Sequence, residues 1–359
     1  MMKLAFILDQ LSSIKIDKDS SFAMMLEAAS RGHQLFVIQQ GDLSWKNGKT
    51  VGISCELELT GQTAADSNWY KDMGVAEIPL QEFDVVLMRK DPPFNMEYIY
   101  STYLLELAEK QGVCIINSPQ GLRDHNEKFS IANFPQFIAP TLVTRKDHLI
   151  REFLNEHDDI ILKPLDGMGG TGVFRVNGAD YNTSVIIETL THYGTQMIMA
   201  QRYIPEILQG DKRILLVGGK PAPYVLARIP RKGESRGNLA TGGFGVAQPL
   251  TSRDHEIAKA LGPYLYDQGL MLVGLDVIGD YLTEINVTSP TCMQEIRNMT
   301  DFNVAGMMVG GQPSTNHSIA FFCKACWLGR VNKILTASKR IGYEPEIRFA
   351  EYEDFALRP

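Results

Sequence analysis

Residues 160–173 read IILKPLDGMGGTGV, and this stretch decides the fold that we expect for the chain. A β-branched apolar run ends in Lys163, a glycine-rich turn follows, and residues 173–176 are again largely apolar. The pattern predicts a strand, a loop and a second strand. Four glycines within six residues let the backbone turn tightly and offer N–H groups to an anion, at which Lys163 can also point its ammonium.

Two common phosphate-binding loops do not match this stretch. It lacks the Gly-Lys-Ser/Thr sequence that closes a Walker loop into a helix. Its glycine spacing also differs from the dinucleotide fingerprint, and a strand follows it where that fingerprint has a helix. Taken alone, the stretch fits either an anion-binding loop or a plain surface turn.

The composition is that of an ordinary globular protein, with 359 residues, 44% hydrophobic and 21% charged. The length predicts two or three domains. The net charge of −7 argues against binding to nucleic acid. Because the protein as a whole is acidic, an anion-binding site has to be a local pocket. The first apolar run, residues 4–8, is too short for a signal peptide, and no run approaches the ~20 residues that span a membrane. Five irregularly spaced cysteines suggest reduced thiols and a cytoplasmic location.

The first 122 residues predict a parallel α/β domain. Strands are expected at residues 3–8, 34–38, 85–88 and 113–117, with helices at 20–31, capped by Ser20-Ser21, and at 97–111. The sequence WKNGK at 45–49 is typical of a tight hairpin. Arg89 and Lys90 directly follow a strand, where open α/β sheets bind ligands, although a solvated loop held by Pro92-Pro93 is the alternative.

Residues 123–201 predict a smaller subdomain around the glycine-rich stretch. Lys128 is expected in a helix, residues 147–157 in an amphipathic helix, and residues 197–201 in a strand. The extended segment after that strand, Arg202 to Pro205, is a suitable wall for an adenine ring because it offers free backbone groups beside apolar side chains.

Residues 202–313 predict a larger subdomain with strands at 214–217 and 224–229. Between these strands and the next lies PRKGESRGNLATGGFG at 230–245, with five glycines and three cations but no periodicity. Connections of this length are often active-site lids, and a disordered insertion is the alternative.

A second informative stretch is VGLDVIGDYLTEINV at 273–287, which predicts a hairpin. Glu284 and Asn286 lie two residues apart and so face the same side of their strand. A three-residue turn, 279–281, would set Asp276 opposite Glu284, whereas a two-residue turn would put it on the other face. Three oxygen-bearing side chains on one face suit Mg²⁺; a solvent-facing sheet surface is the alternative.

In their order, these features resemble the ATP-grasp ligases and, among them, the bacterial glutathione synthetases. The similar stretches are MRKDPPF at 88–94, ILKPLDGMGG at 161–170, RIP at 228–230 and TEINVTSPT at 283–291. The resemblance spans residues 2–308 and implies an α/β (α+β) ATP-grasp fold preceded by an N-terminal parallel-sheet α/β domain.

The resemblance also implies residue roles. The residues implied to bind ATP are Lys128, Lys163, Gly167, Gly169, Gly170, Gln201, Tyr203, Ile204 and Asp211. Those implied to hold Mg²⁺, with Mn²⁺ as a possible substitute, are Asp276, Glu284 and Asn286. The catalytic residues are expected to be Arg213, Arg228 and Arg236, and the substrate-binding residues Arg89, Ser289 and Thr291.

The implied reaction joins γ-glutamylcysteine and glycine with ATP, through an acyl phosphate on the α-carboxylate of the cysteine residue. The protein would catalyse this reaction by positioning the reactants and by stabilising charge with its lysines, its arginines and Mg²⁺, and it would need no nucleophile of its own. Another ATP-grasp carboxylate–amine ligase is the nearest alternative, and a non-catalytic ATP-binding regulator is a second. The resemblance also suggests a homotetramer.

The resemblance ends after residue 308. Gly310-Gly311-Gln312-Pro313 is expected to break the last helix, and residues 314–359 form an extension of unassigned role with a helical pattern at 318–340. Cys323 and Cys326 form a CxxC, which supports a metal or redox site only weakly because no second ligand pair accompanies it.

Overall fold

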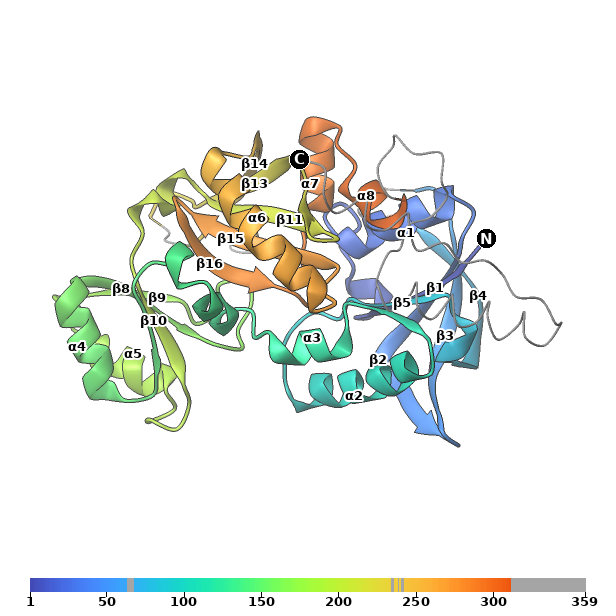
Figure 1. Ribbon diagram of the computed structural model, residues 1–359, viewed down its shortest axis with the longest axis horizontal. Coiled ribbons are helices and arrows are strands. Elements are labelled where there is room, and N and C mark those ends of the chain that lie inside the picture. The colour runs from blue at the N-terminus through green and yellow to red at the C-terminus, as the bar shows by residue number, and fades with distance from the viewer. Residues whose placement is uncertain (63–67, 234–235, 238, 240–241, 311–359) are drawn as a thin grey trace.

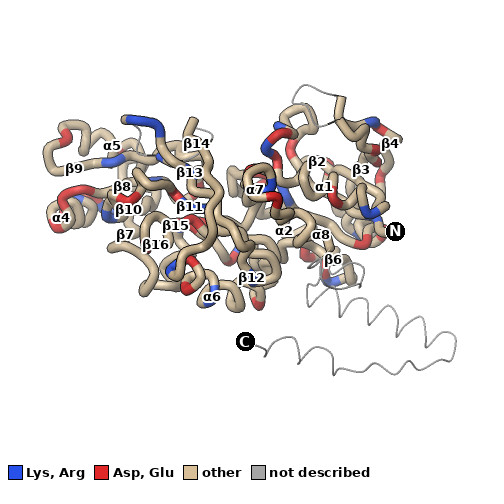
Figure 2. Tube along the Cα trace, turned by 90° about the horizontal axis from the view of Figure 1, so that it is seen from above, with Lys and Arg blue, Asp and Glu red and all other residues tan. Residues whose placement is uncertain are grey.

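The computed structural model describes residues 1–62, 68–233, 236–237, 239 and 242–310. This described part of the chain builds three β-sheets, which follow one another along the longest axis of the molecule (Figure 1). The N-terminal sheet lies at one end, the sheet that carries residue 211 in the middle, and the small sheet that carries Lys163 at the other end. The view from above keeps this order (Figure 2).

The N-terminal sheet is mixed, with its parallel part at the core. In spatial order its strands are β4 (Tyr70–Pro79), β3 (Lys49–Leu59), β2 (Gln34–Lys46), β1 (Lys3–Leu8), β5 (Val85–Met88) and β6 (Cys114–Ile116). β1 pairs in parallel with β2 and β5, and β5 with β6, as the sequence predicts. β2 continues far beyond residue 38 because it forms an antiparallel hairpin with β3, closed by Asn47 and Gly48 at positive φ.

Helices cover both faces of this sheet. They are α1 (Ser20–Ser30), α2 (Met96–Lys110), α3 (Pro119–Asp124), α7 (Met293–Thr300) and α8 (Val304–Gly310). α1 and α8 share a core with one face of the sheet, whereas α2 shares a core with the other. The expected cap of α1 is wrong: Asp19, in extended conformation, accepts the hydrogen bond from Phe22 N, and Ser20 and Ser21 are buried inside the helix.

The small sheet confirms the strand, loop and strand expected from residues 160–176. Its order is β7 (Thr141–Thr144), β10 (Ile198–Arg202), β8 (Asp159–Pro164) and β9 (Phe174–Asn177), and all its pairs are antiparallel. α4 (Asp147–His157), which the sequence predicts, and α5 (Thr183–Leu190) supply Ile150, Leu154 and Ile187 to a separate core beneath it.

The middle sheet is antiparallel and presents its two faces to different surroundings. Its strands in order are β14 (Phe244–Pro249), β13 (Tyr224–Ile229), β11 (Asp211–Val217), β15 (Leu272–Ile278) and β16 (Tyr281–Asn286), with the short β12 (Lys220–Pro221) beside β11. α6 (Ser252–Asp267) covers one face, where Lys212 pairs with Asp254 at its N-terminal turn. Side chains alternate along β11, so Asp211 and Arg213 face the opposite side.

The β15–β16 hairpin reaches the expected pairing by an unexpected route. Ile278 pairs with Tyr281, so the turn has two residues, which is the alternative that by itself would put Asp276 on the other face. A β-bulge follows: Val277 pairs with Leu282, but Asp276 pairs with Glu284, which leaves Thr283 as the extra residue. The bulge reverses the alternation once and therefore returns Asp276 to the face of Glu284.

Lys128 does not lie in a helix, contrary to expectation. It ends a turn that precedes a short 3₁₀ helix, Phe129–Asn133. The Asn126 side chain accepts hydrogen bonds from Lys128 N and Phe129 N, and this local alternative competes with an α-helix.

Several sequence predictions fall on residues outside the described ones. These are the extension at 314–359, with its helical pattern and Cys323 and Cys326, and parts of the expected lid, namely 234–235, 238 and 240–241. The division of the chain at residues 122, 201 and 313 stays a prediction. Among the described residues, no helix combines the length and apolar character needed to cross a bilayer.

Candidate active site

The glycine-rich loop lies between β8 and β9 and has the backbone that its composition predicts. Gly169, Gly170 and Gly172 all adopt positive φ, at 63°, 80° and 71°. L-residues with side chains rarely occupy this region, so the loop requires glycine at these positions. Lys163 is the penultimate residue of β8, directly before the loop.

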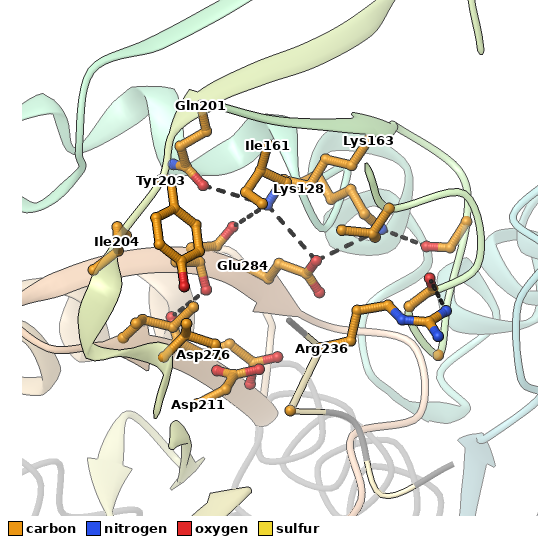
Figure 3. A pocket seen from close by; sticks show the side chains of 18 of the residues that line it. Lys128, Ile161, Lys163, Gln201, Tyr203, Ile204, Asp211, Arg236, Asp276 and Glu284 are labelled. Carbon is orange, nitrogen blue, oxygen red and sulfur yellow. Dashed lines mark hydrogen bonds and ion pairs between the residues drawn. The ribbon is translucent and has the colours of Figure 1, made fainter. Parts of the chain in front are cut away.

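A pocket opens between the small sheet and the middle sheet (Figure 3). Twelve residues that the sequence singled out line it: Lys128, Lys163, Gly167, Gly169, Gly170, Gln201, Tyr203, Ile204, Asp211, Arg236, Asp276 and Glu284. Segments far apart in the chain thus meet at one place. Three further lining residues lie in segments that the sequence singled out: Met168 in the glycine-rich loop, Arg202 in the expected adenine wall and Gly237 in the expected lid. The sequence assigned no site role to the rest, which are Ile161, Val173, Ile207, Ile278 and Thr283.

Two lysines and one carboxylate form the centre of the pocket. Glu284 Oε1 lies 3.8 Å from Lys128 Nζ and 3.9 Å from Lys163 Nζ, so the carboxylate sits between two ammonium groups (Figure 3). Both lysine side chains are almost fully buried. Burial lowers the pKa of the Lys163 ammonium and Lys128 adds to this, whereas Glu284 opposes it. Two nearly buried cations held by one anion leave an excess of positive charge for a ligand to neutralise.

Lys163 and Lys128 are also tied to the backbone around the pocket. Lys163 Nζ donates to Thr283 O at 3.3 Å and to Gln201 Oε1 at 3.5 Å. Lys128 Nζ donates to Gly167 O in the glycine-rich loop. The lysines therefore connect the loop with the bulged hairpin of the middle sheet.

The end of the pocket near β10 combines extended backbone with apolar and aromatic side chains. Gln201 Nε2 donates to Thr141 Oγ1 at 3.0 Å, and Tyr203 and Ile204 follow β10 in the chain. The guanidinium of Arg175 lies 3.7 Å from the centre of the Tyr203 ring, and it is held by a bidentate pair with Asp159. This stacking fixes the ring at the edge of the pocket.

Buried arginines and aspartates form a second charged cluster on the same face of the middle sheet. Asp276 Oδ1 accepts from Arg213 Nε at 2.5 Å, and Asp276 Oδ2 lies 2.8 Å from Arg228 Nη2. Arg228 Nη2 also pairs with Asp211 Oδ2 at 2.5 Å. The four groups compensate one another in a fork-like arrangement that sequence spacing does not reveal.

The pKa values in this cluster follow from burial and pairing. Burial alone would raise the pKa of the Asp276 carboxyl, but Arg213 and Arg228 outweigh burial and hold that pKa well below its usual range. Burial raises the pKa of Asp211 to about 7, against the effect of Arg228. Asp211 Oδ1 is buried without a hydrogen-bond partner in the described part of the chain, so it is free to accept from a ligand hydroxyl.

The residues proposed for a metal offer hard oxygen donors, although they are not a ready-made cage. In the described ranges, no group of three or more His, Cys, Asp and Glu side chains is arranged to hold a metal. Asp276 and Glu284 face each other across the hairpin, and Asn286, whose Nδ2 donates to Gly274 O at 3.2 Å, lies on the strand of Glu284. The Glu284 carboxylate accepts no hydrogen bond from any described residue and points into the pocket, which Asp276 also lines and Asn286 does not. The carboxylates of Asp276 and Glu284 are donors that Mg²⁺ prefers, and phosphate oxygens would complete the coordination.

Arg236 extends across the pocket from the long connection before β14. Its Nη1 donates to Gly170 O at 3.2 Å, which joins this connection to the glycine-rich loop. Gly237, the next residue, lies against Arg228: a Cβ at this position would come within 2.4 Å of Arg228 O. Gly237 therefore packs closely against the arginine cluster, and the role of the connection as a lid stays a prediction.

Three predicted substrate residues do not line the pocket. The side chain of Arg89 is buried, and it donates to Ser21 Oγ at 3.0 Å and to Pro290 O at 2.9 Å. Ser289 Oγ bonds to Asp91 Oδ1, and Thr291 Oγ1 lies 3.7 Å from Cys292 Sγ. Arg89 thus tethers the N-terminal sheet to the loop after β16, and a substrate role for these residues stays a prediction.

Comparisons of the fold define the class of protein. The structure is similar to the ATP-grasp ligase PsnB complexed with minimal precursor, with a TM-score of 0.58 and 14% identity over 92% of this chain and 99% of that one. D-cycloserine synthetase DcsG gives a TM-score of 0.57 with 16% identity over 80% and 92%. The chain therefore has the ATP-grasp fold.

Comparisons of the sequence give the family. Residues 127–301 match the family model "Prokaryotic glutathione synthetase, ATP-grasp domain", and residues 2–123 match the model of the N-terminal domain of the same family. Glutathione synthetase of Nitrosomonas europaea is 64% identical over 308 residues, which cover 86% of this chain and 96% of the relative. Glutathione synthetase of Ralstonia nicotianae is 56% identical over 86% and 94%. The chain belongs to the prokaryotic glutathione synthetase family of ATP-dependent ligases.

Proposed function

We propose that the pocket between the two ATP-grasp sheets binds ATP and carries out the ligation of glycine to γ-glutamylcysteine. Family membership supports the reaction, and one observation carries the assignment of the site: Lys128 and Lys163 flank Glu284 at the root of the glycine-rich loop. The excess positive charge there suits the phosphates of a nucleotide.

The nucleotide would lie along the pocket. In this proposal the γ-phosphate would lie near Lys128, Lys163 and the loop N–H groups, and the adenine ring would lie beside Tyr203 and Ile204, which all line the pocket. The orphaned Oδ1 of Asp211 supports a ribose contact, since a ribose hydroxyl can donate to it.

Asp276, Glu284 and Asn286 are proposed to hold Mg²⁺. The metal would supply charge neutralisation for the phosphates. Binding of a cation also explains why Glu284 stands in the pocket without hydrogen-bond donors from the described residues. Mn²⁺, which accepts similar oxygen ligands, is expected to substitute.

The arginines are proposed to act on the acid substrate. The α-carboxylate of the cysteine residue attacks the γ-phosphate, ADP leaves, and the glycine amine then displaces phosphate from the acyl phosphate. Arg213 and Arg228, oriented by Asp276 and Asp211, would stabilise the carboxylate and the developing charge. Arg236 and its connection, residues 230–245, would exclude water, which hydrolyses acyl phosphates.

The decisive experiment measures ADP release from the purified full-length protein. We expect release that requires γ-glutamylcysteine and glycine together, with glutathione formed in equal amount. Faster turnover with another acid would assign the site to a different carboxylate–amine ligase. ATP binding without turnover for any acid would support the non-catalytic regulator.

The family resemblance also supports a homotetramer, and the five irregularly spaced cysteines support a cytoplasmic location. Light scattering coupled to size-exclusion chromatography tests the assembly, with four chains per particle as the expected result. Cell fractionation tests the location.

A further inference from the structure

The metal-site strand β16, which carries Glu284 and Asn286, lies at an edge of the middle sheet, and one residue, Glu127, accepts hydrogen bonds from this strand and from the loop that follows it. β16 pairs with β15 on one side only. On the other side, Glu127 O accepts from Ile285 N at 2.7 Å, and Glu127 Oε1 accepts from Val287 N at 2.9 Å and Thr288 N at 3.0 Å. Glu127 therefore supplies acceptors for backbone N–H groups at the end of this edge, where no neighbouring strand of the described chain does so.

A third donor completes the contact. Thr288 Oγ1, on a buried side chain, donates to the same Oε1 at 2.8 Å. Three donors on one carboxylate oxygen make charge-assisted hydrogen bonds, which are stronger than neutral ones. Ile285 and Val287 flank Asn286, so Glu127 accepts hydrogen bonds from the backbone on both sides of that proposed metal ligand.

The neighbours of Glu127 reach the other half of the pocket. Asn126 Nδ2 donates to Leu165 O at 3.1 Å, just before the glycine-rich loop. Lys128 Nζ donates to Gly167 O and lies 3.8 Å from Glu284 Oε1. Three consecutive side chains thus hold the loop of the small sheet and the edge strand of the middle sheet at a fixed separation.

We propose that Glu127 is a positioning residue that sets the metal-site strand in register with the phosphate-binding lysine. This inference rests on the proposed metal site. The Glu127 carboxylate touches neither nucleotide nor metal in this assignment. It acts by fixing where Glu284 and Asn286 stand relative to Lys128, and a shift of β16 along its free edge would separate these groups.

The test measures how much Mg²⁺ strengthens nucleotide binding. Calorimetric titrations of the non-hydrolysable analogue AMP-PNP, in excess EDTA and in excess Mg²⁺, give the ratio of the two affinities. We expect Glu127→Ala to reduce this ratio about tenfold, because it removes all three hydrogen bonds to the carboxylate and each contributes about two- to threefold. Glu127→Gln should restore most of the ratio, because its amide oxygen still accepts.

Thr251→Ala is the matched control. It removes another side-chain contact to backbone N–H, the cap of α6, on the opposite face of the same sheet. Its melting temperature should fall, with the ratio unchanged. A folded Glu127→Ala variant whose ratio equals that of the wild type overturns the proposal, whatever its melting temperature.

Two further variants keep the result interpretable. If Glu127→Ala does not fold, Thr288→Val replaces it, because this variant removes one of the three donors to the carboxylate. The ratio should then fall about two- to threefold, and an unchanged ratio overturns the proposal.

Glu284→Ala tests the metal site itself. In one outcome, Mg²⁺ fails to strengthen AMP-PNP binding in Glu284→Ala while it still does so fully in the Glu127 and Thr288 variants. That result refutes only the role of Glu127. Retention in Glu284→Ala refutes the metal assignment.

Discussion

At the scale of single residues, pairing decides how each charged group in the pocket behaves. Lys163 is buried and faces one carboxylate shared with Lys128, whereas Arg228 is buried between Asp211 and Asp276. The lysines therefore carry an excess positive charge that a ligand can neutralise, whereas the two aspartates fix the orientation of the Arg228 guanidinium.

Lys163→Met should weaken nucleotide binding about ten- to a hundredfold, since a charge-assisted bond contributes ~1.5–3 kcal/mol. The methionine keeps the volume of the buried stem, so the fold should persist. Calorimetry with AMP-PNP measures the effect, and Lys46→Met, which breaks an exposed pair with Glu77, is the control. An unchanged affinity would remove Lys163 from the phosphate site.

Arg228→Lys should lower kcat/KM for γ-glutamylcysteine about tenfold or more while changing nucleotide affinity little, because lysine keeps the charge but loses the planar fork. Lysine is preferable to alanine here, since alanine would leave buried Asp211 and Asp276 without a partner. Arg123→Lys, in a pair with Glu106 in the N-terminal domain, is the matched control. A kinetically silent Arg228→Lys would contradict the proposed substrate contact.

Glu109 in α2 provides a test of pH dependence away from the pocket. Burial, and to a smaller extent Glu106, raises the pKa of Glu109 to about 7. A carboxyl with a raised folded pKa favours its neutral form in the fold, so its contribution to stability falls as pH rises from about 4.5 to about 7. Glu109→Gln should thus increase the free energy of unfolding by about 1 kcal/mol at pH 8, after allowance for partial exposure, and by much less at pH 5. Equal effects in urea titrations at both pH values would count against the assignment.

At the scale of elements, the β15–β16 hairpin shows how one extra residue decides the chemistry of a strand. Its two-residue turn alone would direct Asp276 away from Glu284, and the bulge at Thr283 reverses this. Thr283 Oγ1 donates to Asp276 O at 3.1 Å, so the extra residue is held to the opposite strand. Its own carbonyl accepts from Lys163.

Thr283→Val should cost about 1 kcal/mol in the free energy of unfolding, because it removes one hydrogen bond at nearly constant volume. It should also weaken AMP-PNP binding about threefold, since the bulge carries the carbonyl that orients Lys163. Thr50→Val removes an equivalent bond, from Thr50 Oγ1 to Leu104 O, far from the pocket. Thr283→Val and Thr50→Val could lose the same stability and bind AMP-PNP equally well. That result would show that the bulge does not position Lys163.

At the scale of the whole molecule, side chains from the N-terminal domain hold the loop that follows the metal-site strand. Asn117 Nδ2 donates to Leu272 O and Val287 O, and its Oδ1 accepts from Leu272 N. Arg89 donates to Pro290 O three residues further on. The N-terminal sheet and the middle sheet are thus joined by buried polar contacts as well as by a shared apolar core.

Asn117→Ala should cost about 3 kcal/mol or more, because it leaves several buried backbone groups without partners. Chemical denaturation followed by fluorescence and by circular dichroism measures the loss. Asn303→Ala, which removes one hydrogen bond to Glu27 and one from Gly306 N at the start of α8, should cost less. A loss below about 1 kcal/mol for Asn117→Ala would mean that water replaces its contacts.

The sequence by itself determined the elements and the chemistry available to the pocket. The strands around Lys163, the glycine-rich loop, the helix at 147–157 and the Asn47-Gly48 turn follow from local periodicity and from backbone preferences that act over a few residues. Glu284 and Asn286 face the same side of one strand, and this likewise follows from the two-residue period of a strand.

Only the tertiary structure decided how these groups meet. The bulge at Thr283, the ion pairs that join Asp276 to Arg213 and Arg228, the burial of Arg89 and the contact of Glu127 with β16 all depend on segments distant in sequence. Register and ion pairing are set by the packing of whole sheets against one another, and no local pattern encodes that packing.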